Sequence, residues 1–526
     1  MADSGISDSL PLRSQAADGP AQGRAPHADK MSRSATGPDM AGAGVARDGP
    51  GAAIAGPRPW LRAALWLAFM GPFFFISYGF ANWWSSRLPH VDSFYFAWEK
   101  AIPFWDWTIL PYMSIDVFYA GSLFLCTSRA ELDTHARRLL AATLISVCGF
   151  LLFPLQFSFI RPATSGFNGY LFQVLSGFDQ PFNQAPSLHI SLLMLLWARY
   201  AGHWRGWPVA LLHGWFFLIG ISVFTTWQHH VIDGVWGMAV GVWCFYLFPD
   251  APAAPAPISA GLPDSPRRRQ LALRYMSAAV LCWSLACYLR GAGWLLLWPA
   301  MALLLVALAY AHFGVAVFQK RHGRLSVAAQ VLLAPYRLGS WLCSRWFSRR
   351  DPVRVEVIPG LCIGRAPGRA DWHQPQPTAV LDLTAEFNAS RAALALPYAN
   401  VPMLDLAAPA LAQLQAALAA LHHLLDCVAP QEKTKTAAKT KAGMAAGNGG
   451  PATRPGQSHA LPGGVLVHCA LGYSRSALVA CAWLLQCGQA NSVADAVAQV
   501  RAARPQIVLP PAFLALLDDY HRSLAQ

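Results

Sequence analysis

The sequence predicts a multi-domain protein: a polytopic α-helical membrane bundle of about six to eight helices, then an α/β domain whose central sheet is flanked by helices. Hydrophobic residues make up 55% of the 526 residues and charged residues only 13%, a balance typical of membrane proteins with soluble parts. Long apolar runs recur as far as residue 318, whereas short strand-like runs alternate with helical segments after residue 351.

Residues 1–57 are rich in Ala, Gly, Ser, Asp and Pro without an apolar period, which predicts a disordered tail. The start of the chain lacks the short apolar core and small-residue cleavage site of a signal peptide, so we expect none to be removed. The first apolar span, from about Trp60 to Ala81, is long enough to cross a bilayer and should stay in place.

The following apolar runs give about eight crossings in total. We expect a membrane domain over 58–250, and a loop with two further spans over 251–320. The further candidate spans are Ile109–Cys126, Leu139–Phe157, Ser187–Ala201, Val209–Thr226, Val231–Phe248, Leu271–Leu289 and Trp294–Phe318.

The distribution of Lys and Arg predicts the orientation. With a cytoplasmic N-terminus, the inside loops hold clusters such as 137–138 and 267–269, and the outside loops hold only Arg87, Lys100, Arg161 and Arg290. We therefore expect a multi-pass protein of a bacterial inner membrane with its C-terminal domain in the cytoplasm. The 11 cysteines all fall in spans or in segments predicted to be cytoplasmic, which agrees with a reducing compartment. The net charge of +13 is explained by these membrane flanks, so no nucleic-acid partner is expected.

The C-terminal part begins with a basic, Trp-containing segment, 321–350, which predicts an amphipathic linker along the inner membrane surface or, alternatively, a plain linker helix. The domain itself is expected over 351–526, with Arg501 and Arg504 on a solvated face or, alternatively, adding positive potential. Its predicted elements are a hairpin over Val353–Gly364, strands over Thr378–Leu383 and Asn400–Leu404, a disordered insertion over 430–463, and helices over 492–503 and 511–523.

The most informative stretch runs from Val465 to Ser476, Val-Leu-Val-His-Cys-Ala-Leu-Gly-Tyr-Ser-Arg-Ser. An apolar strand ends at Cys469, and Arg475 opens a helix after five loop residues. Loop N–H groups and the helix dipole then converge on one point, which makes an anion site and stabilises a thiolate. The Arg475 fork suits two phosphate oxygens, and Gly472 permits the sharp turn. The alternative is a buried core Cys followed by an ordinary solvated Arg.

At these residues the chain resembles the Cys-dependent dual-specificity phosphatases, over about the last 175 residues. The resemblance implies that Cys469 attacks phosphorus, that Arg475 binds the phosphoryl oxygens and that Ser476 assists the thiolate as leaving group. The loop residues that would surround the phosphate are Ala470, Leu471, Gly472, Tyr473 and Ser474.

Such phosphatases also need an Asp that protonates the leaving oxygen. Asp405 follows a strand-like run and precedes a helix expected over 409–427, and like charge from a bound phosphate would raise its pKa. The alternatives are that Asp405 only caps that helix, or that Asp382 is the acid, although Asp382 lies inside a strand-like run.

A second constellation lies in the membrane half. Pro186-Ser187-Leu188-His189 opens the fourth span and His229-His230-Val231-Ile232-Asp233 opens the sixth, both on the predicted outer face. On a helix His229 and Asp233 are i,i+4 neighbours, so the carboxylate would orient the imidazole. Polar groups that converge from two span ends indicate a site rather than packing.

Here the chain resembles the type 2 phosphatidic acid phosphatase superfamily, on Arg161-Pro162, Pro186 to His189, and Ser222 with His229 and Asp233. The resemblance implies phosphoryl transfer to His229, with Asp233 holding its tautomer, His189 protonating the leaving oxygen and Arg161 binding phosphate. Pro154 and Val223 stand where the superfamily has Lys and Arg, which is similar to the inositol phosphoceramide and sphingomyelin synthase branch.

We therefore expect a membrane-bound phosphatase whose membrane domain hydrolyses or transfers a phospholipid head group. One alternative is that the membrane domain is an inert anchor or lipid-binding module. Another is a transporter-like channel with a regulatory domain, and the lack of a visible internal repeat argues against it. Expected partners are a phosphorylated protein or phospholipid and the membrane lipids, with no metal or other cofactor. The loop 470–474 carries no charge, which argues against an inositide substrate. The fusion to a lipid-type membrane domain argues for one, so the sequence does not decide between the substrate classes.

Overall fold

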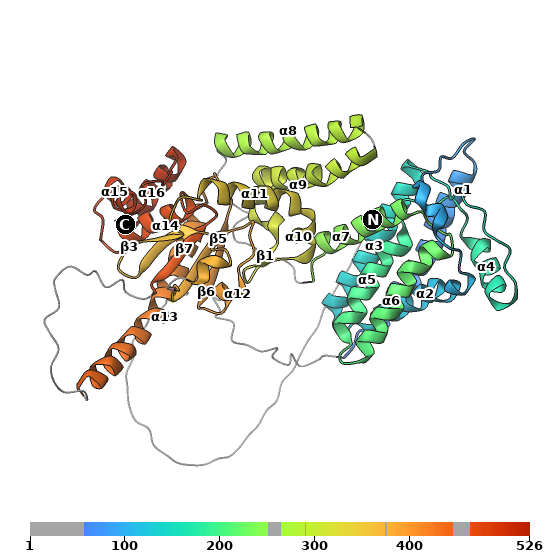
Figure 1. Cartoon of the computed structure of the whole chain (residues 1–526), viewed down its shortest axis with the longest axis horizontal. Helices are drawn as coiled ribbons and strands as arrows, with labels where there is room; N and C mark the ends of the chain where they lie inside the picture. The colour runs from blue at the N-terminus through green and yellow to red at the C-terminus, as the bar shows by residue number, and fades with distance from the viewer. Residues whose placement is uncertain (1–56, 251–264, 290, 374–375, 445–462) are drawn as a thin grey trace, which may run out of the picture. The chain divides into compact units, whose positions relative to one another are not determined.

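The computed structural model describes residues 57–250, 265–289, 291–373, 376–444 and 463–526 (Figure 1). It is mostly helical in its first part and ends in a domain built on a five-stranded sheet. The predicted tail over 1–57 lies outside the described residues except for its last position.

The first part of the chain consists of helices that largely follow the predicted spans. These are α1 (Trp60–Ser86), α2 (Ile109–Leu125), α3 (Arg129–Leu152), α4 (Gly166–Phe178), α5 (Leu188–His203), α6 (Pro208–Thr225), α7 (Val231–Leu247), α8 (Pro266–Leu289) and α9 (Leu297–Leu308). Helix α4 was not predicted, and it lies in what the sequence suggested was a loop.

Within the described ranges, seven helical segments are long and apolar enough to cross a membrane. Six coincide with predicted spans, while α5 and α7, with 16 and 17 residues, are each shorter than any of these seven segments. In both α1 and α8 only 17% of the apolar window is buried. Helices of a water-soluble core bury their apolar side, so this exposure fits a lipid environment.

The seventh segment, Leu411–Val428, belongs to the C-terminal domain, so its hydropathy alone would wrongly suggest a membrane span. It is the first half of α13 (Leu411–Met444), and its side chains Leu414, Leu418 and Leu421 are buried in the core of that domain. The helix also continues into the predicted insertion over 430–463, because Gln, Glu, Lys and Ala are good helix formers. Residues 445–462 lie outside the described part.

The connector between the two parts is more than a linker helix. After α9 come short π and 3₁₀ turns (Ala309–Phe313 and Gly314–Phe318), the hairpin β1 (Lys320–Arg321) and β2 (Arg324–Leu325), and helices α10 (Val327–Leu332) and α11 (Ala334–Phe347). Buried connector residues such as Leu325 and Leu333 share a core with Ala385 and Leu404 of the C-terminal domain. The segment predicted to lie on the membrane surface therefore also packs on the domain.

The sheet has the strand order β3-β4-β7-β5-β6. Its strands are β3 (Arg354–Ile358), β4 (Leu361–Arg365), β5 (Ala379–Thr384), β6 (Tyr398–Met403) and β7 (Val465–Cys469). The predicted hairpin is confirmed as the antiparallel pair β3–β4, whereas β4, β7, β5 and β6 are parallel. Carboxyl ends of parallel strands meet at one sheet edge, which brings the residues after β5, β6 and β7 together.

Helices flank this sheet (Figure 1). Besides α13 they are α12 (Arg391–Leu394), α14 (Arg475–Gln486), α15 (Val493–Ala503) and α16 (Pro511–Leu524), the last two close to their predicted bounds. All five residues of β7 are buried, as expected for a central parallel strand covered on both faces.

Candidate active site

Cys469 is the last residue of β7 and its side chain is buried at the start of the loop to α14. The N–H of Gly472 donates to Cys469 Sγ at 3.2 Å, and Ser476 Oγ lies 3.6 Å from the same sulfur. This amide N–H is thus directed at the sulfur from within the loop. The loop therefore has the geometry of an anion site with a nucleophile inside it.

The loop is held in place by a close backbone approach and by Arg504. Gly472 has φ +80°, and a Cβ there would lie 2.5 Å from the backbone of Gly364 on β4, so only Gly fits. The guanidinium of Arg504 donates to the carbonyl oxygen of Leu471 at 3.2 Å. The prediction of a solvated face holds for exposed Arg501, but it was wrong for Arg504, which is buried because it ties the loop to the domain.

Arg475, the first residue of α14, is fully buried between two carboxylates. Its Nη2 lies 2.8 Å from Glu386 Oε1 and 3.1 Å from Asp405 Oδ1. Burial alone would raise the pKa of Glu386, but Arg475 outweighs burial and holds that pKa below its ordinary value. Nε of Arg475 has no hydrogen-bond partner among the described residues, so it is available to donate to an anion.

Sequence reasoning missed Glu386 as a site residue. The available signal was its place directly after β5, at the sheet edge where the other site residues meet. Its carboxylate accepts from both Nη atoms of Arg475, at 2.8 and 3.2 Å, and so fixes the orientation of the guanidinium.

Asp405 lies just after β6, beside Arg475. Its pKa is raised mainly by burial and further by the charge of Glu386, while Arg475 opposes the shift. The raised pKa was expected from a bound phosphate, but the folded chain already produces it by desolvation. The capping alternative is not supported, because α13 begins only at Leu411 and Gln413 accepts the hydrogen bond from Ala410 N there.

Asp382, the rival acid, is committed to another interaction. Its Oδ2 lies 2.7 Å from Lys320 Nζ of the connector and accepts from Tyr398 at 2.8 Å. Burial would raise the pKa of Asp382, but Lys320 and then His468 reverse the shift and hold it well below its ordinary value. An acid that stays ionised cannot protonate a leaving group near neutral pH, so the geometry favours Asp405.

Replacing Lys320 with Met is expected to lower the free energy of unfolding by about 3–5 kcal/mol, because it leaves Asp382 charged and buried without its partner. Because the pKa of Asp382 is depressed in the folded chain, this stabilisation is full above its ordinary value of 3.8 and is lost as the pH falls below it. Urea unfolding of the purified full chain in detergent measures the change.

The matched control is Arg324→Met, which removes an exposed cation from the same hairpin and should cost less than about 0.5 kcal/mol. The double variant Lys320→Met with Asp382→Asn should recover part of the loss, since the uncompensated charge is gone. Equal effects of Lys320→Met and Arg324→Met would show that the buried pair does not stabilise the domain.

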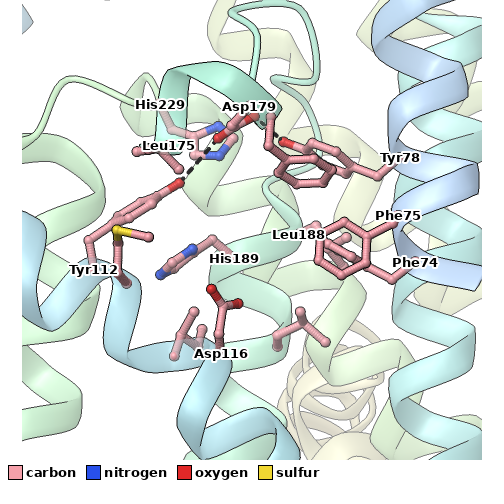
Figure 2. A pocket seen from close by; sticks show the side chains of 14 residues that line it. Phe74, Phe75, Tyr78, Tyr112, Asp116, Leu175, Asp179, Leu188, His189 and His229 are labelled. Carbon is pink, nitrogen blue, oxygen red and sulfur yellow. Dashed lines mark hydrogen bonds between the residues drawn. The ribbon is translucent and has the colours of Figure 1, made fainter. Parts of the chain in front are cut away.

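The helical part contains a cavity of about 110 Å³ that both predicted histidines line. His189, in the first turn of α5, stacks on the ring of Tyr112 at 4.1 Å between centroids. Figure 2 shows His189 and His229 with Tyr112 and two carboxylates, Asp116 and Asp179, around the same space. The structure thus brings together the histidines from the ends of two different helices.

Asp233 lies beside the imidazole of His229 at the predicted i,i+4 spacing, but it does not hydrogen-bond to it. The distance from His229 Nδ1 to Asp233 Oδ2 is 3.7 Å, which is too long for a hydrogen bond. The same oxygen accepts from His230 N at 2.8 Å, because Asp233 lies in the first turn of α7 and satisfies a free amide there. His230 in turn contacts Glu99, which sequence reasoning missed, at 3.1 Å.

The expected phosphate contacts of this cavity are sparse. The guanidinium of Arg161 lies over the ring of Phe172, 5.5 Å from its centroid, and Arg161 does not line the cavity. Sequence reasoning also missed Asp179, which accepts from Tyr78 at 2.6 Å, and Asp116. Asp116 could have been found from the sequence, because an ionisable residue inside an apolar span indicates a functional site.

The comparisons with known proteins concern the C-terminal domain. Residues 457–523 match the family "Dual specificity phosphatase, catalytic domain". This stretch contains Cys469, Arg475 and Ser476. The match does not reach the helical part, whose resemblance to lipid phosphatases stays a prediction, and no curated protein matches the chain.

Solved structures with similarity to this chain include phosphatases that cover about a third of it. A mouse dual specificity phosphatase with zinc tungstate is 24% identical and human DUSP28 is 23% identical, with TM-scores of 0.23 and 0.22. They cover 33% and 34% of this chain, and 89% and 97% of their own lengths. PTPMT1 in complex with PI(5)P is 17% identical, with 33% and 97% coverage and a TM-score of 0.22.

Proposed function

We propose that this chain is a membrane-bound phosphatase whose C-terminal domain hydrolyses phosphomonoesters through a phosphocysteine at Cys469. The substrate classes are phosphorylated tyrosine, serine or threonine in proteins, or a lipid or inositol phosphate. The proposal is carried by the geometry of the loop after β7. Gly472 N donates to the sulfur of Cys469, and Arg475, at the end of the same loop, pairs with Asp405.

In the first step the Cys469 thiolate attacks phosphorus, and a sulfur–phosphorus bond forms as the ester oxygen–phosphorus bond breaks. Asp405, whose pKa is raised by burial, gives its proton to the leaving oxygen. Arg475, oriented by Glu386, and the loop amides stabilise the negative charge on the phosphoryl oxygens.

In the second step water attacks the phosphocysteine and gives a proton to the Asp405 carboxylate. The sulfur–phosphorus bond breaks and inorganic phosphate is released. The hydroxyl of Ser476, 3.6 Å from the sulfur, donates to the departing thiolate and lowers the charge that it must carry.

The test is to trap the intermediate. The full chain in detergent is mixed with radiolabelled aryl phosphate and quenched in acid, which preserves phosphocysteine and destroys phosphohistidine. We expect one labelled peptide containing Cys469 and the same label in a His229→Ala variant. Absence of acid-stable label under turnover, or label on another peptide, would contradict the proposal.

A second candidate function is hydrolysis or transfer of a phospholipid head group by the helical part, through His229. It is favoured by the two histidines that line one cavity. Asp116 and Asp179 line the same cavity, and their negative charge would repel a phosphate dianion. The alternative is therefore that the helical part is a catalytically inert lipid-binding module.

The His229→Ala variant distinguishes these two alternatives. Vesicles that contain the Cys469→Ser chain, with and without His229→Ala, are incubated with phosphatidate or with two phospholipids, and the products are separated. Loss of a product with His229→Ala indicates an active site. Identical products from both chains would leave the cavity a binding or anchoring role.

A further inference from the structure

Three tyrosines, from α8, from the turn after α9 and from the connector, pack beside the domain that holds the phosphatase site. They are Tyr275 of α8, Tyr310 at the end of α9 and Tyr336 of α11. The rings of Tyr275 and Tyr310 stack at 5.5 Å, and Tyr336 meets Tyr275 edge-on at 5.9 Å. Tyr310 is buried in one core with Ala385 and Leu404 of the C-terminal domain, and Tyr275 and Tyr336 pack against that core.

Tyr310 joins this aromatic group directly to the general-acid loop. Its hydroxyl donates to the carbonyl oxygen of Asp405 at 2.7 Å. Arg268 of α8 donates to the carbonyl oxygens of Tyr310 and Ala311, which holds the end of the α9 segment against α8. The loop that carries the acid therefore contacts the turn that follows α9, and α8 braces that turn. Both helical segments are apolar enough to cross a membrane.

Helix α11 separates the catalytic loop from an exposed apolar surface. On its inner side Arg337 donates to the carbonyl oxygen of Glu386 at 3.0 Å, and the hydroxyl of Tyr473 donates to the carbonyl oxygen of Phe347 at 3.3 Å. Its other side carries the α11 apolar face, which we define as the exposed side chains Leu338, Trp341, Leu342, Trp346 and Phe347.

The occupant that fits the α11 apolar face is a lipid bilayer. Trp298, an exposed side chain of the apolar helix α9, donates to the carbonyl oxygen of Val331 in α10, just before α11, and so links this connector to a helix of the membrane-spanning set. Exposed Arg349 and Arg350 follow the face, and Arg349 stacks over Trp346 at 4.2 Å. Aromatic and aliphatic side chains beside exposed cations suit an interface with anionic lipids.

A bilayer against the α11 apolar face would lie about one helix diameter, roughly 10 Å, from the catalytic loop. We propose, resting on the phosphatase function above, that the Cys469 site acts on the phosphomonoester of a membrane lipid presented at this surface. The helix ends and α11 hold the site at head-group depth. A phosphopeptide in water gains nothing from the α11 apolar face, whereas a lipid substrate is already concentrated beside it.

The experiment uses the His229→Ala full chain in vesicles of phosphatidylcholine and phosphatidylglycerol, so that the helical cavity contributes no turnover. Phosphate release is measured for two lipids in the vesicle, phosphatidate and phosphatidylinositol phosphate. It is compared with release from two soluble natural esters, glycerol 3-phosphate and a phosphotyrosyl peptide, and from the general substrate p-nitrophenyl phosphate. We expect kcat/KM for at least one lipid to exceed that for both soluble natural esters by about tenfold or more.

The Leu342→Ser, Trp346→Ser double variant tests the surface itself. It should lower turnover of the vesicle lipid about tenfold and leave p-nitrophenyl phosphate hydrolysis unchanged, because neither side chain touches the catalytic loop. Leu524→Ser, which removes an exposed apolar side chain from α16, is the matched control and should change neither rate.

Two outcomes would overturn the inference: preference for the phosphopeptide over every lipid, or vesicle-lipid turnover that the double variant does not alter. Failure of the underlying phosphatase function gives a different result, since p-nitrophenyl phosphate would then be turned over equally by the Cys469→Ser chain. The two failures are therefore distinguishable in one set of assays.

Discussion

A Cys469→Ser chain is expected to lose phosphomonoesterase activity by a factor on the order of 10⁶, the scale seen when other covalent enzymes lose their nucleophile. A serine hydroxyl is not ionised near neutral pH, and its oxygen receives no activation from the Gly472 amide comparable to that of a thiolate. The change is nearly isosteric at a buried position, so the domain should remain folded. Phosphate release from p-nitrophenyl phosphate measures the loss, and the melting temperature of both chains checks folding.

The matched control is Cys487→Ser, an exposed cysteine at the end of α14. It should retain full activity because it lies outside the loop. Cys481, in the same helix, is not a competing nucleophile, because burial raises the pKa of its thiol to about 12. Residual turnover in Cys469→Ser well above that of the uncatalysed reaction would mean that another group carries the chemistry.

Asp405→Asn is expected to lower kcat by about 10²–10⁴-fold for substrates with poor leaving groups, because the leaving oxygen is no longer protonated. Burial raises the pKa of Asp405, so in the native chain the acid keeps its proton above the ordinary value of 3.8. Activity should therefore fall as the pH rises through that raised pKa. Asparagine does not titrate, so this alkaline limb should disappear, as pH profiles of kcat/KM would show.

Leaving-group dependence separates this role from a structural one. p-Nitrophenolate needs little protonation, so its release should suffer much less from Asp405→Asn than release of an alkyl alcohol. Asp518→Asn, at an exposed position of α16, serves as the control and should leave both rates unchanged. Equal losses for both leaving groups, with an intact alkaline limb, would assign Asp405 to positioning Arg475 instead.

Much of the catalytic loop could be predicted because its chemistry is local. Cys469, Gly472, Arg475 and Ser476 lie within eight consecutive positions, and a strand–loop–helix folds them around one point whatever surrounds it. The apolar helices were predictable for a similar reason, since length and hydropathy are properties of a continuous segment. The exception, Leu411–Val428, shows that a buried helix of an α/β domain can have the same hydropathy as a span.

Local sequence determined the strand–loop–helix that holds Cys469 and Arg475, and which segments are apolar enough to cross a membrane. Only the tertiary structure decided that Asp405 rather than Asp382 faces Arg475, that Glu386 orients the guanidinium, and that Asp233 caps a helix instead of holding His229. These outcomes depend on pairs far apart in the chain, such as Lys320 with Asp382 and Tyr310 with Asp405. A carboxylate's role is set by the partner it meets on burial, and that partner is known only when the chain is folded.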